Sequence, residues 1–355
     1  MRVFLIILDG CPSYQINQKN TPFLWKMKEN GLYFSNCKTI FPSVTYACHT
    51  TIITGRYPNE HGMIGNLFFD RKKQKISNYD NFNDLRDAVK SETIFKLLEP
   101  IETAAICEPI PIDAKHVTPF FSIYRKELHL HNLIVYNETL RHMNNSQINF
   151  FCLNFTGVDG YGEQFGPDSN EFLNEMKKVD NFISKIYENT NEAIFFIVAD
   201  HGMVNIKEYI DMNDIIKKFN DKIIVAPSHR MCHVYCDEKD VKDLKIFLKN
   251  LDYIDKIFDQ NDIKKLNLFH ERSGNITFSA KEGFEFGVKG LKGSHGGFLD
   301  IEMNVPLLIF SKNLKVSFKH NLKKVSIIDI VPTILSLFNV GLEPSLLGTI
   351  LVNLS

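Results

Sequence analysis

Short, unbroken apolar runs alternate with helical patterns along this chain, and this alternation constrains the fold more than any other feature. The apolar runs are Val3–Leu8, Ile148–Phe155, Ala193–Ala199 and Val305–Phe310. Strands that are apolar at every position are typical of a parallel sheet covered by helices on both faces. Helical patterns occur at about Glu171–Tyr187 and at Ile327–Phe338. The sequence therefore predicts an α/β doubly wound sheet.

One long segment, residues 205–290, departs from this alternation. It contains a strand-like segment at His233–Cys236 and a helical pattern at Lys239–Asn250. A chain of 355 residues is long enough to form one large domain with an insertion. We therefore expect a core formed by residues 1–204 and 291–355, interrupted by a small α+β subdomain.

Composition excludes several classes of protein. The chain has 41 basic and 42 acidic residues, so it lacks the charge that favours nucleic-acid polymers or anionic membranes. Seven cysteines at irregular spacing do not form a disulfide framework, which favours a reducing compartment. The run Val3–Leu8 is too short for a signal peptide or a membrane span. We expect a cytoplasmic protein with neither a nucleic-acid nor a membrane partner.

Polar clusters follow several of the predicted strands. They are Asp9, Asp159 with Glu163 in a glycine-rich loop, Asp200 with His201, and His295. Ligand sites of open α/β sheets lie at the carboxyl ends of the strands. A single aspartate there is usually a cap or turn residue, but several buried carboxylates and imidazoles would be costly without partners. Such mixed oxygen and nitrogen donors suit zinc, and manganese less well.

Thr45 lies where a polar, proline-containing segment meets the apolar-periodic run from Ala47 to Ile53. A hydroxyl at that junction would stand at a helix N-terminus, where free backbone N–H groups favour an anion. Taken alone, the position fits an ordinary N-cap threonine better. Two metal sites with a hydroxyl between them would instead form an arrangement suited to in-line phosphoryl displacement.

Six motifs occur in a fixed order. They are LDG at 8–10, FPSVT at 41–45, TGRYPNEHGMIGN at 54–66, VDGYGEQFGP at 158–167, ADHGM at 199–203 and GSHGG at 293–297. Each motif is weak by itself, but all six in this order resemble the type I phosphodiesterase/nucleotide pyrophosphatase family of the alkaline phosphatase superfamily. The resemblance covers most of the predicted core and implies an alkaline-phosphatase-like fold.

The resemblance also implies roles for matching residues. It implies two divalent metal ions, zinc or alternatively manganese. The first would be held by Asp9, Thr45, Asp200 and His201, and the second by Asp159, Glu163 and His295. Thr45 would be the nucleophile, and Asn66 would bind a phosphate oxygen. Tyr46 matches an aromatic position on the leaving-group or nucleobase side, although packing against the core is an equally good interpretation.

Glu163 is the main departure from the family pattern, which has a histidine at this position. Glutamate can bind zinc through oxygen, or a harder metal such as manganese. Alternatively, Glu163 points away from the site and the second metal is bound weakly or not at all.

The resemblance implies hydrolysis of a small-molecule phosphate ester, such as a nucleotide, through a phosphothreonine intermediate. Within the superfamily, the alternatives are a phosphomonoesterase, a phosphonoacetate-type hydrolase and a mutase-like enzyme. An alternative of another class is a non-catalytic binding protein with a degenerate second metal site.

Overall fold

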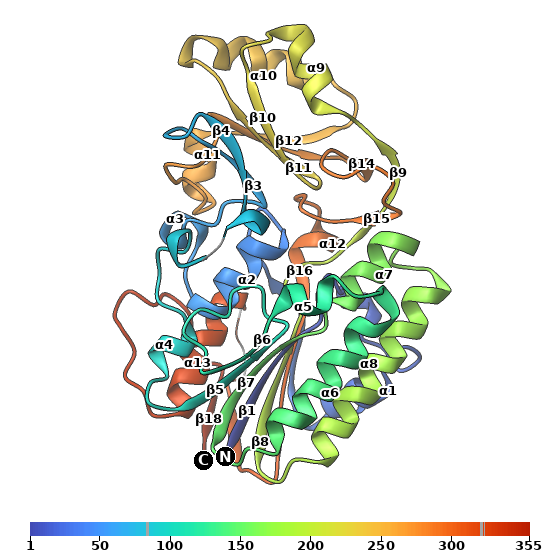
Figure 1. Ribbon diagram of the computed structural model, residues 1–355, viewed down its shortest axis with the longest axis vertical. Helices are drawn as coiled ribbons and strands as arrows, with labels where there is room; N and C mark the ends of the chain where they lie inside the picture. Colours follow the sequence, from blue (N-terminus) through green and yellow to red (C-terminus); the bar gives the residue numbers. More distant parts are fainter. Residues whose placement is uncertain (83–84, 320–321, 323) are drawn as a thin grey trace.

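The computed structural model describes residues 1–82, 85–319, 322 and 324–355. In this part of the chain, seven strands form a central sheet in the order β2-β16-β8-β1-β7-β5-β6 (Figure 1). Their bounds are β1 (Arg2–Ile7), β2 (Leu32–Lys38), β5 (Glu102–Ile106), β6 (His116–Thr118), β7 (Ile148–Asn154), β8 (Ala193–Val198) and β16 (Asn304–Lys312). Only β16 runs against the other strands of this sheet.

The central strand β1 pairs in parallel with β7 on one side and β8 on the other. The Phe4 ring stacks between Phe151 and Phe195, with ring centroids 4.7 and 4.9 Å apart. All three side chains are fully buried. A strand buried on both faces needs apolar residues at every position, which explains the unbroken apolar runs in the sequence.

Helices cover both faces of this sheet (Figure 1). One layer contains α1 (Pro22–Met27), α6 (His131–Met143), α7 (Gly157–Phe165) and α8 (Asn170–Glu188). The other contains α2 (Thr45–Thr54), α4 (Ile94–Leu97) and α13 (Ile330–Leu337), with α3 (Pro58–His61) beside α2. The predicted doubly wound α/β architecture is thus confirmed.

A second antiparallel sheet stands at the end of the molecule away from the termini (Figure 1). Its order is β10-β11-β13-β12, and it shares a hydrophobic cluster of its own with two of the three helices in this part of the chain. The elements are α9 (Met212–Phe219), β10 (Ile224–Ser228), β11 (Met231–Tyr235), α10 (Val241–Lys249), β12 (Ile254–Asp259), α11 (Gln260–Lys265) and β13 (Ile276–Ala280). This is an α+β unit within the segment singled out above, whose boundaries at 205 and 290 stay a prediction.

Smaller sheets complete the fold. A three-stranded sheet of β9 (Val204–Tyr209), β14 (Gly283–Glu285) and β15 (Gly293–Ser294) lies between the central sheet and the α+β unit (Figure 1). The other described elements include the hairpin β3 (Leu67–Asp70) with β4 (Lys75–Asn78), α5 (Phe120–Tyr124), α12 (Asp300–Met303), and β17 (Val316–Phe318) paired with β18 (Val352–Leu354). Across the described residues, no helix combines the length and the apolar character needed to cross a bilayer.

The segment predicted as a glycine-rich loop is in fact helix α7, Gly157–Phe165. Its glycines serve close packing rather than a flexible turn. A Cβ atom at Gly162 would lie 2.4 Å from Sδ of Met203, which follows β8. The prediction failed because glycine is required here by a contact with a residue distant in sequence, which the local pattern does not reveal. As a consequence, Asp159 and Glu163 lie one helical turn apart on the same face.

Candidate metal centre and nucleophile

The first cluster of predicted site residues lies at the carboxyl ends of the neighbouring strands β1 and β8. Asp9 follows β1, and Asp200 and His201 follow β8. Gly10 turns the chain with φ of +68°, and its N–H donates to Asp200 Oδ1 over 3.0 Å. A side chain at Gly10 would not fit, because its Cβ would lie 2.6 Å from Asp159 Oδ1. The LDG motif therefore brings three carboxylates to one place.

Asp9, Asp200 and His201 offer ligand atoms within 4.8 Å of one another, and we call them the first ligand group. The distance from His201 Nε2 to Asp200 Oδ2 is 3.1 Å, and to Asp9 Oδ1 it is 3.8 Å. All three side chains are buried. Thr45 Oγ1 lies 3.4 Å from His201 Nε2. The structure therefore assembles all four residues predicted for the first metal.

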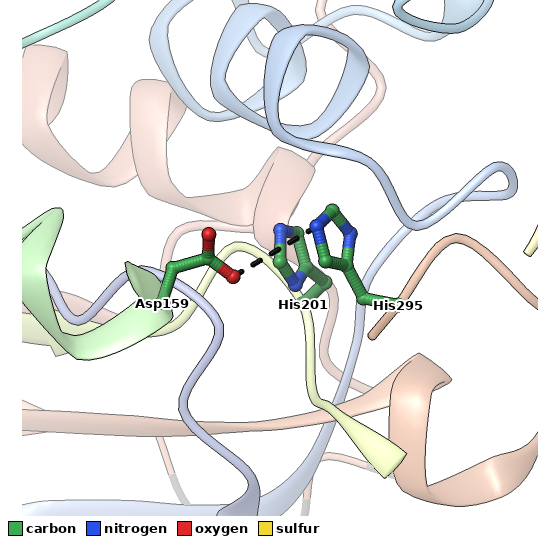
Figure 2. A group of neighbouring side chains, drawn as sticks. All are labelled: Asp159, His201 and His295. Carbon is green, nitrogen blue, oxygen red and sulfur yellow. Dashed lines mark ion pairs between the residues drawn. The ribbon is translucent and has the colours of Figure 1, made fainter. Parts of the chain in front are cut away.

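Asp159, Glu163 and His295 form a second cluster, which we call the second ligand group. His295 Nε2 is 3.8 Å from Asp159 Oδ1 and 4.0 Å from Glu163 Oε1. The His295 ring stacks on His201 with centroids 3.6 Å apart, which joins the two groups (Figure 2). Glu163 thus points into the site, and the alternative in which it points away is wrong.

Thr45 is the first residue of α2, and Val44 is its N-cap. The backbone N–H groups of a first helical turn have no partners within the helix, so they can bind an anion. Seven of the nine predicted site residues line a cavity of about 370 Å³: Asp9, Thr45, Tyr46, Asn66, Asp159, Glu163 and His295. The other two, Asp200 and His201, are buried beside Asp9.

The two remaining predicted residues, Tyr46 and Asn66, also line this cavity. The Tyr46 hydroxyl donates to Asp80 Oδ1 over 2.6 Å, while its ring lies 5.8 Å from that of Tyr79. Tyr46 is therefore both packed against the protein and part of the cavity wall. The backbone N–H of Asn66 donates to Ser228 Oγ, which fixes the position of its side chain at the cavity.

Several ligand atoms in this site lack the partners that buried polar atoms require. Among the described residues, Asp9 Oδ1, Asp159 Oδ1, Asp200 Oδ2 and His295 Nε2 are buried without a hydrogen-bond partner. Each such atom costs about 1–3 kcal/mol. Cations between the two groups would satisfy all four atoms, and the donor set of carboxylate oxygens and imidazole nitrogens suits zinc. The residues present therefore fit bound divalent metals.

The pKa values of these carboxylates and imidazoles also fit bound cations. Burial and the neighbouring Asp200 raise the pKa of Asp9 to about 7. Burial and the nearby Glu163 raise the pKa of Asp159 well above its ordinary value. Burial also lowers the pKa of His201 to about 4 and depresses the pKa of His295. The imidazoles are thus held in the neutral form that binds metals, while the crowded carboxylates need positive charge nearby.

The sequence did not reveal His49, a buried residue of α2. Its Nδ1 is 2.9 Å from Glu108 Oε2, and its Nε2 is 3.6 Å from Asp200 Oδ2. Burial alone would lower the pKa of His49, but the surrounding carboxylates, Glu108 above all, raise it to about 9. His49 therefore lies against the first ligand group on its buried side. Its position one turn after Thr45 was the available signal.

The sequence also did not reveal His229, which lies between β10 and β11. Its Nδ1 is 3.6 Å from Glu163 Oε1, and its ring centroid is 4.2 Å from that of His295. Glu163, His229 and His295 offer ligand atoms within 4.8 Å of one another. A single histidine in a turn of the inserted segment gives no sign that it reaches the core.

Two curated relatives illustrate the likeness at the sequence level. Ectonucleotide pyrophosphatase/phosphodiesterase family member 1 of Mus musculus is 24% identical over 235 residues, which cover 59% of this chain and 25% of the relative. The bis(5'-adenosyl)-triphosphatase ENPP4 of Homo sapiens is 25% identical over 220 residues, covering 57% of this chain and 47% of the relative. The chain thus spans between a quarter and about half of the length of these relatives.

Solved structures share the fold over nearly the whole chain. Murine ectonucleotide pyrophosphatase/phosphodiesterase 5 superposes with a TM-score of 0.78 at 18% identity, covering 97% of this chain and 96% of that protein. Phosphonoacetate hydrolase of Sinorhizobium meliloti 1021, solved with phosphonoformate, gives a TM-score of 0.73 at 17% identity, covering 93% and 94%. These likenesses confirm the predicted alkaline-phosphatase-like fold.

The family itself is shown by a match over most of the sequence. The family model described as type I phosphodiesterase/nucleotide pyrophosphatase matches residues 3–297. This range contains both ligand groups, Thr45 and the inserted α+β unit. The chain therefore belongs to the type I phosphodiesterase/nucleotide pyrophosphatase family, within the alkaline phosphatase superfamily.

Proposed function

We propose that this chain is a metal-dependent phosphoric ester hydrolase of the phosphodiesterase and nucleotide pyrophosphatase type. It would act on a small phosphate ester, such as a nucleotide, through a phosphothreonine intermediate. One observation carries this proposal. The Thr45 hydroxyl stands at the N-terminus of α2, lines the cavity, and lies 3.4 Å from Nε2 of His201 in the first ligand group.

Two divalent cations, zinc or alternatively manganese, would occupy the two ligand groups. Asp9, Thr45, Asp200 and His201 would hold the first, and Asp159, Glu163 and His295 the second. When bound, such cations make the threonine hydroxyl a stronger nucleophile and neutralise charge on the phosphoryl oxygens.

The protein's own groups account for the remaining parts of the reaction. Thr45 Oγ1 would release its proton to solvent and form a bond to phosphorus while the bond from phosphorus to the leaving oxygen breaks, which leaves a phosphothreonine. A water molecule would then release a proton and form a new bond to phosphorus, while the bond to Thr45 Oγ1 breaks and the threonine hydroxyl regains its proton. The Asn66 amide and the backbone N–H of Tyr46 would donate to the phosphoryl oxygens and stabilise the charge that develops there.

The shape of the cavity supports a small substrate. Its volume of about 370 Å³ is in the range of sites for small ligands. Tyr46, Phe120 and Tyr124 place aromatic rings in the wall, where a planar group of the substrate such as a nucleobase could stack. An inactive threonine-to-alanine variant of the murine relative has been solved in complex with AMP, and it shares the fold with a TM-score of 0.77.

The decisive variant is Thr45→Ala. We expect turnover of a nitrophenyl nucleotide diester to fall by at least about 10⁴-fold, as for other lost nucleophiles. Thr349→Ala serves as a matched control, because that side chain is exposed and belongs to neither ligand group. Circular dichroism checks that both variants keep the fold. Near-wild-type turnover in Thr45→Ala would refute the assignment of the nucleophile.

Substrate comparison separates this proposal from its alternatives. A preference for a nitrophenyl monoester over the nucleotide diester would favour a phosphomonoesterase. Release of inorganic phosphate from phosphonoacetate would favour a phosphonoacetate-type hydrolase. Fewer than one bound metal per chain, with no hydrolysis of any of these substrates, would favour a non-catalytic binding protein.

A further inference from the structure

We propose that His229 is a ligand of the second metal, so that the inserted subdomain completes the metal centre of the core. This inference rests on the proposed function, because it assumes a metal at the second ligand group. Glu163 stands where the family pattern has a histidine. His229, in the turn between β10 and β11, supplies an imidazole in its place. The resulting set is Glu163, His229 and His295, with Asp159 beside it.

The geometry places the three ligand atoms around one point. Glu163, His229 and His295 offer ligand atoms within 4.8 Å of one another. Two imidazoles and one carboxylate are a donor set found in catalytic zinc sites, which keep a further position open for water or substrate. Asp159 Oδ1 faces the same region, 3.8 Å from His295 Nε2. Without His229, the site would hold one imidazole and two carboxylates.

Backbone contacts hold His229 firmly in place. The Arg230 N–H donates to the His295 carbonyl over 2.9 Å, which ties the turn to the segment that carries His295. The Phe286 N–H donates to the carbonyl of His229 over 3.3 Å. His229 itself has φ of +52°, an uncommon value for a residue other than glycine. Such conformations persist where surrounding structure imposes them, often at functional sites.

The carboxylate of Glu285 does not account for His229, although it lies 4.0 Å from Nδ1. Its Oε2 accepts the hydroxyl of Ser294 over 2.6 Å, and its Oε1 accepts the backbone N–H groups of Gly287 and Val288. Both carboxylate oxygens of Glu285 therefore already accept hydrogen bonds from other groups. The nearer carboxylate oxygen to His229 Nδ1 is Glu163 Oε1, at 3.6 Å. His229 Nδ1 thus faces Glu163 of the second ligand group, with the Ser294 hydroxyl 3.4 Å away as a further neighbour.

The test uses His229→Asn in the full chain. Asparagine tolerates a positive φ, so this change removes the imidazole without straining the turn. Zinc content is measured after dialysis, and zinc affinity by competition with a chromophoric chelator. We expect two zinc ions per wild-type chain and, in the variant, at least about tenfold weaker binding of one of them. Should the asparagine variant fail to fold, His229→Gly replaces it, because glycine also accepts this φ.

A cobalt spectrum separates a ligand from a residue that only supports Glu163, and a rescue variant checks that the site has lost an imidazole. Glu163→His combined with His229→Asn returns an imidazole to the helix, and we expect it to restore the lost affinity to within a few-fold of wild type. In cobalt-substituted protein, His229→Asn should alter the visible absorption bands, which report on the ligands, and the rescue variant should restore them. His129→Ala, at an exposed position, is the matched control.

The outcomes distinguish this inference from the proposed function. If wild-type protein binds two metals and hydrolyses the diester while His229→Asn binds both with unchanged affinity, the inference alone is wrong. Lost affinity in His229→Asn without any change in the cobalt absorption bands would make His229 a positioning residue and would also overturn the inference. If wild-type protein binds no metal and hydrolyses nothing, the proposed function fails first.

Discussion

The two ligand groups are built in different ways. The first is formed by residues that directly follow β1 and β8, two strands paired in parallel over their whole length. Asp200 Oδ1 accepts the N–H groups of Gly10 and His201 over 3.0 and 2.9 Å, so the backbone itself fixes the carboxylate. Such a group is positioned mainly by the sheet, with His49 of α2 beside it.

The second group depends on elements that are far apart in the sequence. Asp159 and Glu163 come from α7, His295 follows β15, and His229 lies between β10 and β11. Helix α7 is anchored to the His295 segment through the Lys292 N–H, which donates to the carbonyl of Glu163 over 2.7 Å. The first site should therefore tolerate changes in the inserted subdomain, whereas the second should respond to them.

The largest effect is expected from Asp200→Asn, in the first group. The amide oxygen can still accept the Gly10 and His201 N–H groups, so the fold should persist. Loss of this charge should lower the affinity for the first metal by more than about 100-fold, which is more than the loss of a residue that only contacts a ligand would cause. Turnover should fall at least as much. Chelator competition and diester hydrolysis measure both quantities.

Asp211→Asn is the matched control for this change. Asp211 caps α9 in the inserted subdomain by accepting the N–H groups of Asn213 and Asp214, and asparagine is an equally good cap. Metal affinity and turnover should therefore stay at their wild-type values. Equal losses in both variants would show that Asp200 acts through general stability, and the contrast between the two regions would then disappear.

An intermediate effect is expected from pH. The pKa of Asp9 is raised to about 7, so below that pH a metal must displace a proton from this carboxyl. Affinity at the first group should rise by up to about tenfold per pH unit below pH 7 and level off above it. At the second group, the pKa of Asp159 is raised well above its ordinary value, which adds a further proton to displace.

The same shift has a consequence for stability. An acid whose pKa is raised on folding stabilises the protein below its ordinary pKa, and this contribution is lost as pH rises through the raised value. Metal-free protein should therefore lose stability from Asp9 between about pH 4 and pH 7. Added zinc should raise Tm by an amount that grows with pH over this range, and thermal denaturation measures it. A zinc-induced shift that is constant from pH 5 to pH 8 would contradict this account.

The sequence allowed a better prediction of the first ligand group than of the second. Asp9, Asp200 and His201 could be placed together from the sequence, because parallel strands end at one edge of the sheet. Helix α7 was mistaken for a loop. Close packing against Met203 requires glycine in this helix, and the local sequence does not show that contact. His229 was not predicted for the same reason, since only the folded chain brings it to His295.

The smallest effect is expected from Asp259→Ala, inside the inserted subdomain. Asp259 caps α11 by accepting the N–H groups of Asn261 and Asp262, and its side chain pairs with Lys245 over 2.8 Å. Loss of the cap should cost about 1 kcal/mol, or about 2 °C in Tm.

The stabilising contribution of Asp259 is present above its ordinary pKa of 3.8. It should vanish as pH falls through about 2, the value to which Lys245 lowers the pKa, so the variant and wild type should converge in acid. Zinc affinity at the first ligand group should not change, because that group is held by the central sheet and α2 rather than by the inserted subdomain. A loss of affinity confined to the second group would show that destabilising the inserted subdomain weakens metal binding through His229. Equal weakening of both groups would instead show that the two sites share one scaffold, and the distinction between them would not hold.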